Sequence, residues 1–87
     1  MLVDEAIRVA LREQGARVGS VWRYLDQPYI GQKLANLAVV NDDPNNFEAE
    51  VHPVNGSESS AGISDLFGLD AAGFSRLLAS GRLRRGH

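Results

Sequence analysis

The sequence predicts a small α+β domain, in which an N-terminal helix is followed by a small antiparallel β-hairpin or sheet and then by a C-terminal pair of helices. Apolar residues recur at helical spacing near the N-terminus, alternate with charged residues around position 50, and return to helical spacing after Gly62. The 87 residues are enough for one domain with a small core. We assign residues 1–54 to the helix and hairpin, 55–62 to a connector, and 63–87 to the helix pair.

The first predicted element is a helix from Val3 to Gln14. Asp4 and Glu5 lie in its first turn, where the helix dipole favours negative charge, and Gly15 is a suitable residue to end it. Its apolar stripe consists of Val3, Ala6, Ile7, Ala10 and Leu11.

The second segment, Arg17 to Leu25, is rich in residues that favour strands. A strand would place Val18, Trp22 and Tyr24 on one face, although periodicity leaves a short helix from Ser20 as an alternative. With Tyr29, the aromatic residues form either a stacking surface flanked by Arg17 and Arg23 or part of the core. We favour the core.

Ile30 to Val40 fits a helix as a whole, but its last part, Leu37–Val40, also fits a buried strand. Phe47 to Val51 alternates apolar with charged residues, as a half-exposed strand does. Asn41–Asn46 between them consists of turn-forming residues. We therefore expect a hairpin from Leu37–Val40 and Phe47–Val51, with an acidic turn at its tip.

The oxygen-rich turn is a candidate calcium site by ligand type alone. Asp42, Asp43, Asn45 and Asn46 offer oxygen ligands, but their spacing is not that of an EF-hand and Pro44 interrupts them. We interpret the segment as a solvated turn, and predict neither a metal nor another cofactor. Asn55 to Gly62 has the composition of a flexible connector.

The C-terminal quarter suggests two short helices joined by a tight turn. The first would span Ile63–Phe67 and the second Ala71–Ser80. Gly68 is expected to have a positive φ angle at the join, and Gly81 to end the second helix. Asp70 is a suitable N-cap because its carboxylate can accept free N–H groups of the first turn. The expected inward residues are Ile63, Leu66, Phe67, Leu69, Phe74, Leu77 and Leu78.

This quarter resembles a helix-turn-helix of the excisionase or MerR-like type. The resemblance is carried by Phe67-Gly68-Leu69 at the turn, by Phe74 and Leu77 as apolar anchors, and by Ser80-Gly81-Arg82-Leu83 at the exit. It implies a small regulator that binds double-stranded DNA through the second helix, and a chain of this size would act as a homodimer or as several adjacent copies.

The residues assigned to DNA contact follow from that resemblance. Ala71, Ala72, Ser75 and Arg76 would lie near base edges, with Arg76 as the main reader of sequence. Arg82, Arg84 and Arg85 would contact phosphates.

Charge segregation supports a second hypothesis, a protein-binding module. Residues 41–75 carry seven acids and no lysine or arginine, whereas residues 76–87 carry four arginines and no acid. The acidic middle segment, including Asp42, Asp43, Glu48 and Glu50, would meet a basic surface of a protein partner. An inhibitor, adaptor or assembly component of a virus or mobile element fits this description.

The sequence gives no sign of catalytic machinery. His52 lies on the polar face of an expected strand, His87 is terminal, and the serines cluster in the connector, where nothing would orient them. We predict a non-enzymatic protein. No stretch has the apolar length of a membrane span, and the absence of cysteine fits the cytoplasm.

Overall fold

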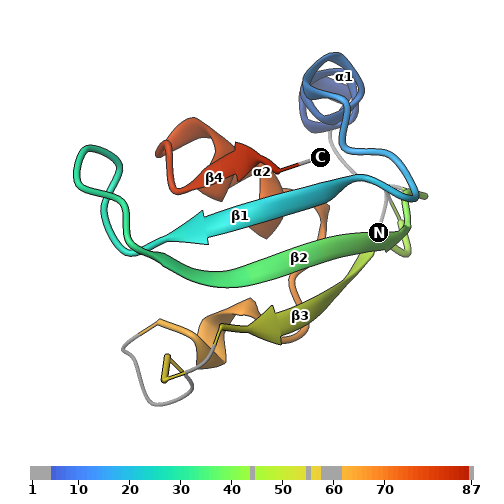
Figure 1. Ribbon diagram of the computed structural model, residues 1–87. Coiled ribbons are helices and arrows are strands. Elements are labelled where there is room, and N and C mark those ends of the chain that lie inside the picture. Colours follow the sequence, from blue (N-terminus) through green and yellow to red (C-terminus); the bar gives the residue numbers. More distant parts are fainter. Residues whose placement is uncertain (1–4, 44, 55, 58–61, 87) are drawn as a thin grey trace.

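The computed structural model describes residues 5–43, 45–54, 56–57 and 62–86. They form an α+β fold, as predicted, with one helix before a four-stranded antiparallel sheet and one helix inserted ahead of its last strand (Figure 1). In chain order the elements are α1 (Glu5–Gln14), β1 (Val21–Leu25), β2 (Lys33–Asn41), β3 (Glu48–Pro53), the 3₁₀ turn η1 (Ser64–Leu66), α2 (Ala71–Ala79) and β4 (Leu83–Arg85).

The sheet has the strand order β3-β2-β1-β4, so β3 and β4 are its two edges. The expected hairpin is confirmed as β2 and β3, in which Leu37 lies opposite Val51 and Val39 opposite Ala49. The strand interpretation of Arg17–Leu25 is confirmed for Val21–Leu25, and the helix from Ser20 is wrong. A helix over 30–40 is also wrong, because Leu34, Ala35, Leu37 and Val39 are buried as part of the sheet.

The core lies on one face of this sheet and is covered by α2, which Figure 1 shows behind β1. Phe74 of α2 is fully buried. Its ring meets Trp22 edge-on at a centroid distance of 5.6 Å and Phe47 at 5.0 Å. The predicted burial of Phe74 is therefore confirmed, and its aromatic partners come from β1 and from Phe47, the residue directly before β3.

The N-terminal helix is confirmed over Glu5–Gln14, while Val3 and Asp4 lie outside the described residues. Leu11 is buried, and Ile7 packs against the core beside it. Gly15, with φ of +79°, follows the last helical residue as expected.

The C-terminal helix pair is matched only in part. Within residues 63–67, only Ser64–Leu66 form a turn of 3₁₀ helix, with the N–H groups of Asp65 and Leu66 bonded to carbonyls three residues back. Phe67 is already extended, so helical spacing misplaces it: its side chain is 60% exposed, and the expectation that it faces inward is wrong. Gly68 has φ of +79° as predicted.

The second helix matches its prediction closely. Asp70 caps α2 by accepting the N–H of Gly73 at 2.8 Å, and Gly81, with φ of +80°, follows its end. Beyond it the basic tail forms β4, which pairs with β1 so that Leu83 lies opposite Tyr24 and Arg84 opposite Arg23. No strand was expected there.

Two further expectations concern exposure and the connector. Trp22 and Tyr24 are buried as predicted, but Tyr29 is 99% exposed and Val18 is 58% exposed, so neither joins the core. Of the connector, only residues 56, 57 and 62 are described. Ser57 there is buried and its hydroxyl donates to the carbonyl of Leu34.

Candidate protein-interaction surface

The outer edge of β3 carries backbone groups without partners among the described residues. The N–H of Val54 donates to the carbonyl of Leu34, which sets the phase of pairing between β2 and β3. Because bonded pairs alternate in an antiparallel ladder, Glu50 and His52 bond to β2, whereas Ala49 and Val51 point their N–H and C=O groups outward. An open edge of this kind is a template for pairing with another strand.

An open groove of about 870 Å³ runs along this edge. Residues 47–52, with Asn41 and Asn46, form one wall, and the segment Phe67–Asp70 forms the other. Ala49, Val51 and Leu69 are partly buried against the core, and Phe67 stands exposed beside them. The groove therefore offers apolar contact along its length next to free backbone groups.

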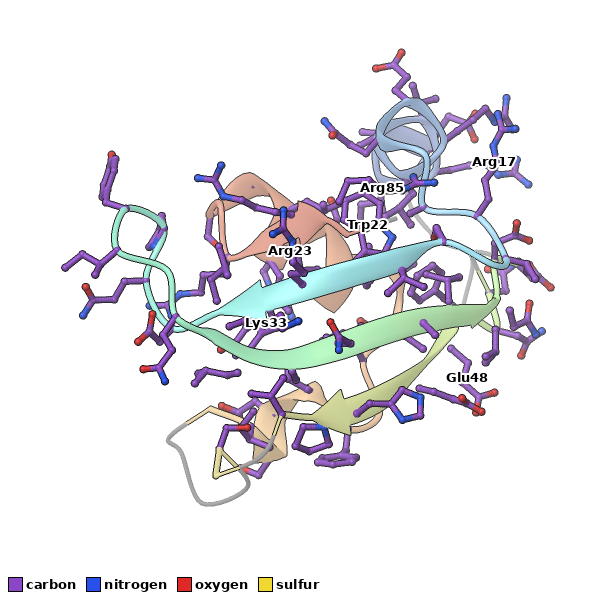
Figure 2. All side chains as sticks on the ribbon, viewed as in Figure 1. Arg17, Trp22, Arg23, Lys33, Glu48 and Arg85 are labelled. Carbon is purple, nitrogen blue, oxygen red and sulfur yellow. The ribbon has the colours of Figure 1, made fainter. Side chains whose placement is uncertain are left out.

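The charge of this groove is acidic. Glu48, Glu50 and Asp70 line it, and the described lining residues include no lysine or arginine. The glutamate side chains are exposed on the strand, and His52 Nε2 lies 3.3 Å from a carboxylate oxygen of Glu50. Figure 2 shows Glu48 at the β3 side of the molecule, away from Arg23 and Arg85 on the opposite side.

The two aspartates of the hairpin turn lie outside the groove lining. Asp42 accepts the backbone N–H of Val18 at 3.1 Å and thereby ties the hairpin turn to the segment before β1. Asp43 accepts the N–H of Asn45 at 3.1 Å and the side-chain amide of Asn46 at 3.2 Å. Of the four acids assigned to partner binding, Glu48 and Glu50 thus line the groove, and Asp42 and Asp43 shape the turn.

The residues assigned to base contact differ in accessibility along α2. Ala71 is 1% exposed, so its methyl group belongs to the core and is not available at the surface. Ala72 and Ser75 are half-buried, and Arg76 is exposed. The surface of α2 therefore presents small side chains around one arginine.

The three arginines of the tail donate to main-chain carbonyls of their own chain. Arg85 Nη1 donates to Gly15 O at 2.8 Å, and its guanidinium carbon lies 5.3 Å from the ring centroid of Trp22. Arg82 donates to the carbonyl of Asp26, and Arg84 Nη2 to that of Pro28 at 3.1 Å. Arg82 and Arg84 thus brace the loop between β1 and β2.

That loop is a surface feature absent from the sequence interpretation. Tyr29 and Ile30 at its tip are 99% and 82% exposed, and in Figure 1 the loop extends beyond the end of the sheet. A signal was present in the sequence, because Tyr29 and Ile30 stand between Pro28 and Gly31, both of which favour turns. For the exposure of Phe67, the signal in the sequence was Gly68, because a glycine that follows a helical turn indicates that helical spacing no longer applies.

The described residues contain no group of three histidine, aspartate or glutamate side chains placed to hold a metal. Within the same residues, no helix is long and apolar enough to cross a membrane.

Comparisons with protein-family models, with curated proteins and with solved structures gave no match to this chain.

Proposed function

We propose that this chain is a non-enzymatic, cytoplasmic protein-binding module that captures an extended, basic segment of a partner by strand addition to β3. One observation carries the proposal: the free β3 edge lies inside an acidic groove whose far wall holds an exposed phenylalanine. Main-chain hydrogen bonds supply affinity in this recognition mode, and pockets for alternate side chains supply specificity.

The partner's chemistry follows from the groove. An added strand would bond to the outward groups of Ala49 and Val51, one of its faces would pack on Phe67 and Leu69, and the other would meet the glutamates. Alternating basic and apolar residues satisfy both faces. Because Glu48 and Glu50 are solvent-exposed, they would contribute mostly to selectivity and association rate, and their effect would weaken in salt.

A labelled peptide of sequence Lys-Val-Lys-Val-Lys-Val tests the proposal by fluorescence anisotropy. We expect binding that Glu48→Lys with Glu50→Lys weakens by about tenfold or more, equivalent to about 1.4 kcal/mol. The matched control is Glu5→Lys with Glu13→Lys, which makes the same change in net charge on α1, where both residues are exposed. Absence of binding, or equal loss in both double variants, would refute strand capture at β3.

DNA binding is the second candidate, and the pairing of Arg23 with Arg84 favours it. These exposed residues lie directly opposite each other on β1 and β4, and like charges in that position repel unless an anion lies nearby. Exposed Arg76 on α2 would be the base-reading residue, flanked by the small Ala72 and Ser75.

A gel-shift series against duplex DNA at two salt concentrations tests this second candidate. Replacing Arg82, Arg84 and Arg85 should flatten the log–log salt slope by nearly one unit for each arginine that binds a phosphate. Arg76→Ala should instead cost about 1–3 kcal/mol on a preferred site and relax selection at one base pair. If every fragment is shifted to the same extent at both salt concentrations, the DNA hypothesis is refuted.

A further inference from the structure

We propose that the β1–β2 loop, residues 26–32, is a docking plug that enters the β3 groove of a second copy, so that chains join head to tail. This inference rests on the groove of the proposed function, and the occupant that it names is a folded loop rather than an extended strand. The plug is defined by its exposed tip, Tyr29 and Ile30, and by the hydrogen bonds at its base.

The loop is held in one shape by its own backbone. Asp26 donates its N–H to Gln32 O at 3.1 Å and accepts the N–H of Gln32 at 2.8 Å through its carboxylate. Gly31 donates to Gln27 O at 2.8 Å. Arg82 and Arg84 add bonds from the tail to the carbonyls of Asp26 and Pro28. A loop ordered before contact loses little conformational entropy when it docks.

The tip is apolar and almost fully exposed, which is unusual for two adjacent large side chains. Tyr29 is 99% exposed and Ile30 82%, and a rigid tyrosine at a loop tip is a typical interface anchor. In the groove, Phe67, Leu69, Ala49 and Val51 provide the matching apolar surface. Burying the two tip residues there would remove from water the most exposed large apolar side chains among the described residues.

The plug itself carries one charged side chain, Asp26, whose carboxylate accepts the N–H of Gln32, and basic residues flank the plug. The charge of these flanking residues is complementary to that of the groove. Lys33 follows the plug directly, and Figure 2 shows it at that end of the sheet. Arg84 is exposed and bonded to Pro28 within the plug. Facing them in a second copy would be Glu48, Glu50 and Asp70 of the groove. The same acids oppose pairing of two β3 edges, since glutamates would then face glutamates.

Plug and groove of one chain occupy different parts of the molecule. The plug projects beyond one end of the sheet (Figure 1). The groove runs along the β3 edge. A contact between two different patches is heterologous, so it generates a ring or an open chain of copies rather than a closed two-fold dimer. Assembly should therefore grow with protein concentration and weaken with salt.

Sedimentation velocity on the full chain measures this assembly directly. We expect species larger than one chain at low salt and high protein concentration, and one chain at high salt. Tyr29→Ser with Ile30→Ser removes the apolar tip of the plug, and Glu48→Lys with Glu50→Lys reverses two of the three acidic charges of the groove. Each variant alone should sediment as a monomer. All four side chains are exposed, so folding is expected to be retained and can be checked by circular dichroism.

Mixing the two variants is the decisive step. One variant keeps an intact groove and the other an intact plug, so an equimolar mixture should form a two-chain complex and nothing larger. Val18→Ser, which also removes an exposed apolar side chain, and Glu5→Lys with Glu13→Lys are the matched controls and should assemble like the parent chain.

A parent chain that stays monomeric at every concentration would overturn the proposal, and so would a mixture that gives no complex. Assembly that survives removal of the plug would overturn it as well. If the Lys-Val peptide binds the groove while the parent chain stays monomeric, the groove function stands and only the choice of a second copy fails. If the peptide does not bind yet the mixture pairs, strand capture of foreign segments fails and the plug contact stands.

Discussion

Two phenylalanines on either side of the Gly68 turn have opposite environments. Phe74 is fully buried against Trp22 and Phe47, whereas Phe67 is 60% exposed at the groove wall. The sequence assigned both to inward faces because both fit helical spacing. The difference arises because the helical hydrogen bonds end at Leu66 and the backbone becomes extended at Phe67.

These two residues give a matched pair of substitutions. Phe74→Ala should lower the free energy of unfolding by about 3–5 kcal/mol, since it removes a fully buried ring. Phe67→Ala should change that free energy by less than about 0.5 kcal/mol and should weaken peptide capture instead. Urea denaturation followed by circular dichroism measures the free energy of unfolding of the two variants. A similar destabilisation by both substitutions would contradict the assigned environments.

Gly68 gives a second prediction at the residue scale. A Cβ atom there would meet no other atom within 4 Å, so the φ of +79° is what opposes substitution by alanine. Gly68→Ala should cost roughly 1–2 kcal/mol, and Gly68→Asn clearly less, because asparagine tolerates the left-handed region better. Thermal melts of the alanine and asparagine variants test this difference. Equal stability of the two variants would mean that the turn adopts another backbone conformation.

At the scale of elements, the predictions succeeded where an element is specified by residues close in the sequence, and failed where it depends on residues far apart in the sequence. The hairpin, α1 and the capped α2 are specified by neighbouring residues, through alternation, an apolar stripe and the Asp70 cap. β4 was missed because three residues give no periodicity and its partner β1 lies far back in the chain. The groove itself was not predicted. Glu48 and Glu50 were assigned to a protein partner as members of an acidic segment, and the second wall of the groove depends on how residues 67–70 fold back on β3.

The bracing of the plug by the tail is testable as a property of these elements. Arg82→Ala with Arg84→Ala should speed amide hydrogen exchange at Gly31 and Gln32, because two hydrogen bonds to the loop's carbonyls are removed. Arg76→Ala is the control, since the exposed Arg76 lies on α2 and should leave those amides unchanged. Unchanged exchange in the double variant would show that the loop's own hydrogen bonds suffice.

At the scale of the whole molecule, charge is distributed between the two edges of the sheet. The β1–β4 side carries Arg23, Arg84 and Arg85, and the β3 side carries Glu48 and Glu50. The sequence predicted this segregation along the chain, and the fold turns it into a separation in space (Figure 2). A molecule polarised in this way is suited to partners of opposite charge on each edge.

Strand addition at β3 is the central claim, and amide hydrogen exchange read residue by residue tests it most directly. On adding the Lys-Val peptide, the amides of Ala49 and Val51 should become protected, because their N–H groups point outward. Those of Glu50 and His52, already bonded to β2, should change little. Uniform protection along β3, or none at Ala49 and Val51 while the peptide is bound, would contradict the claim.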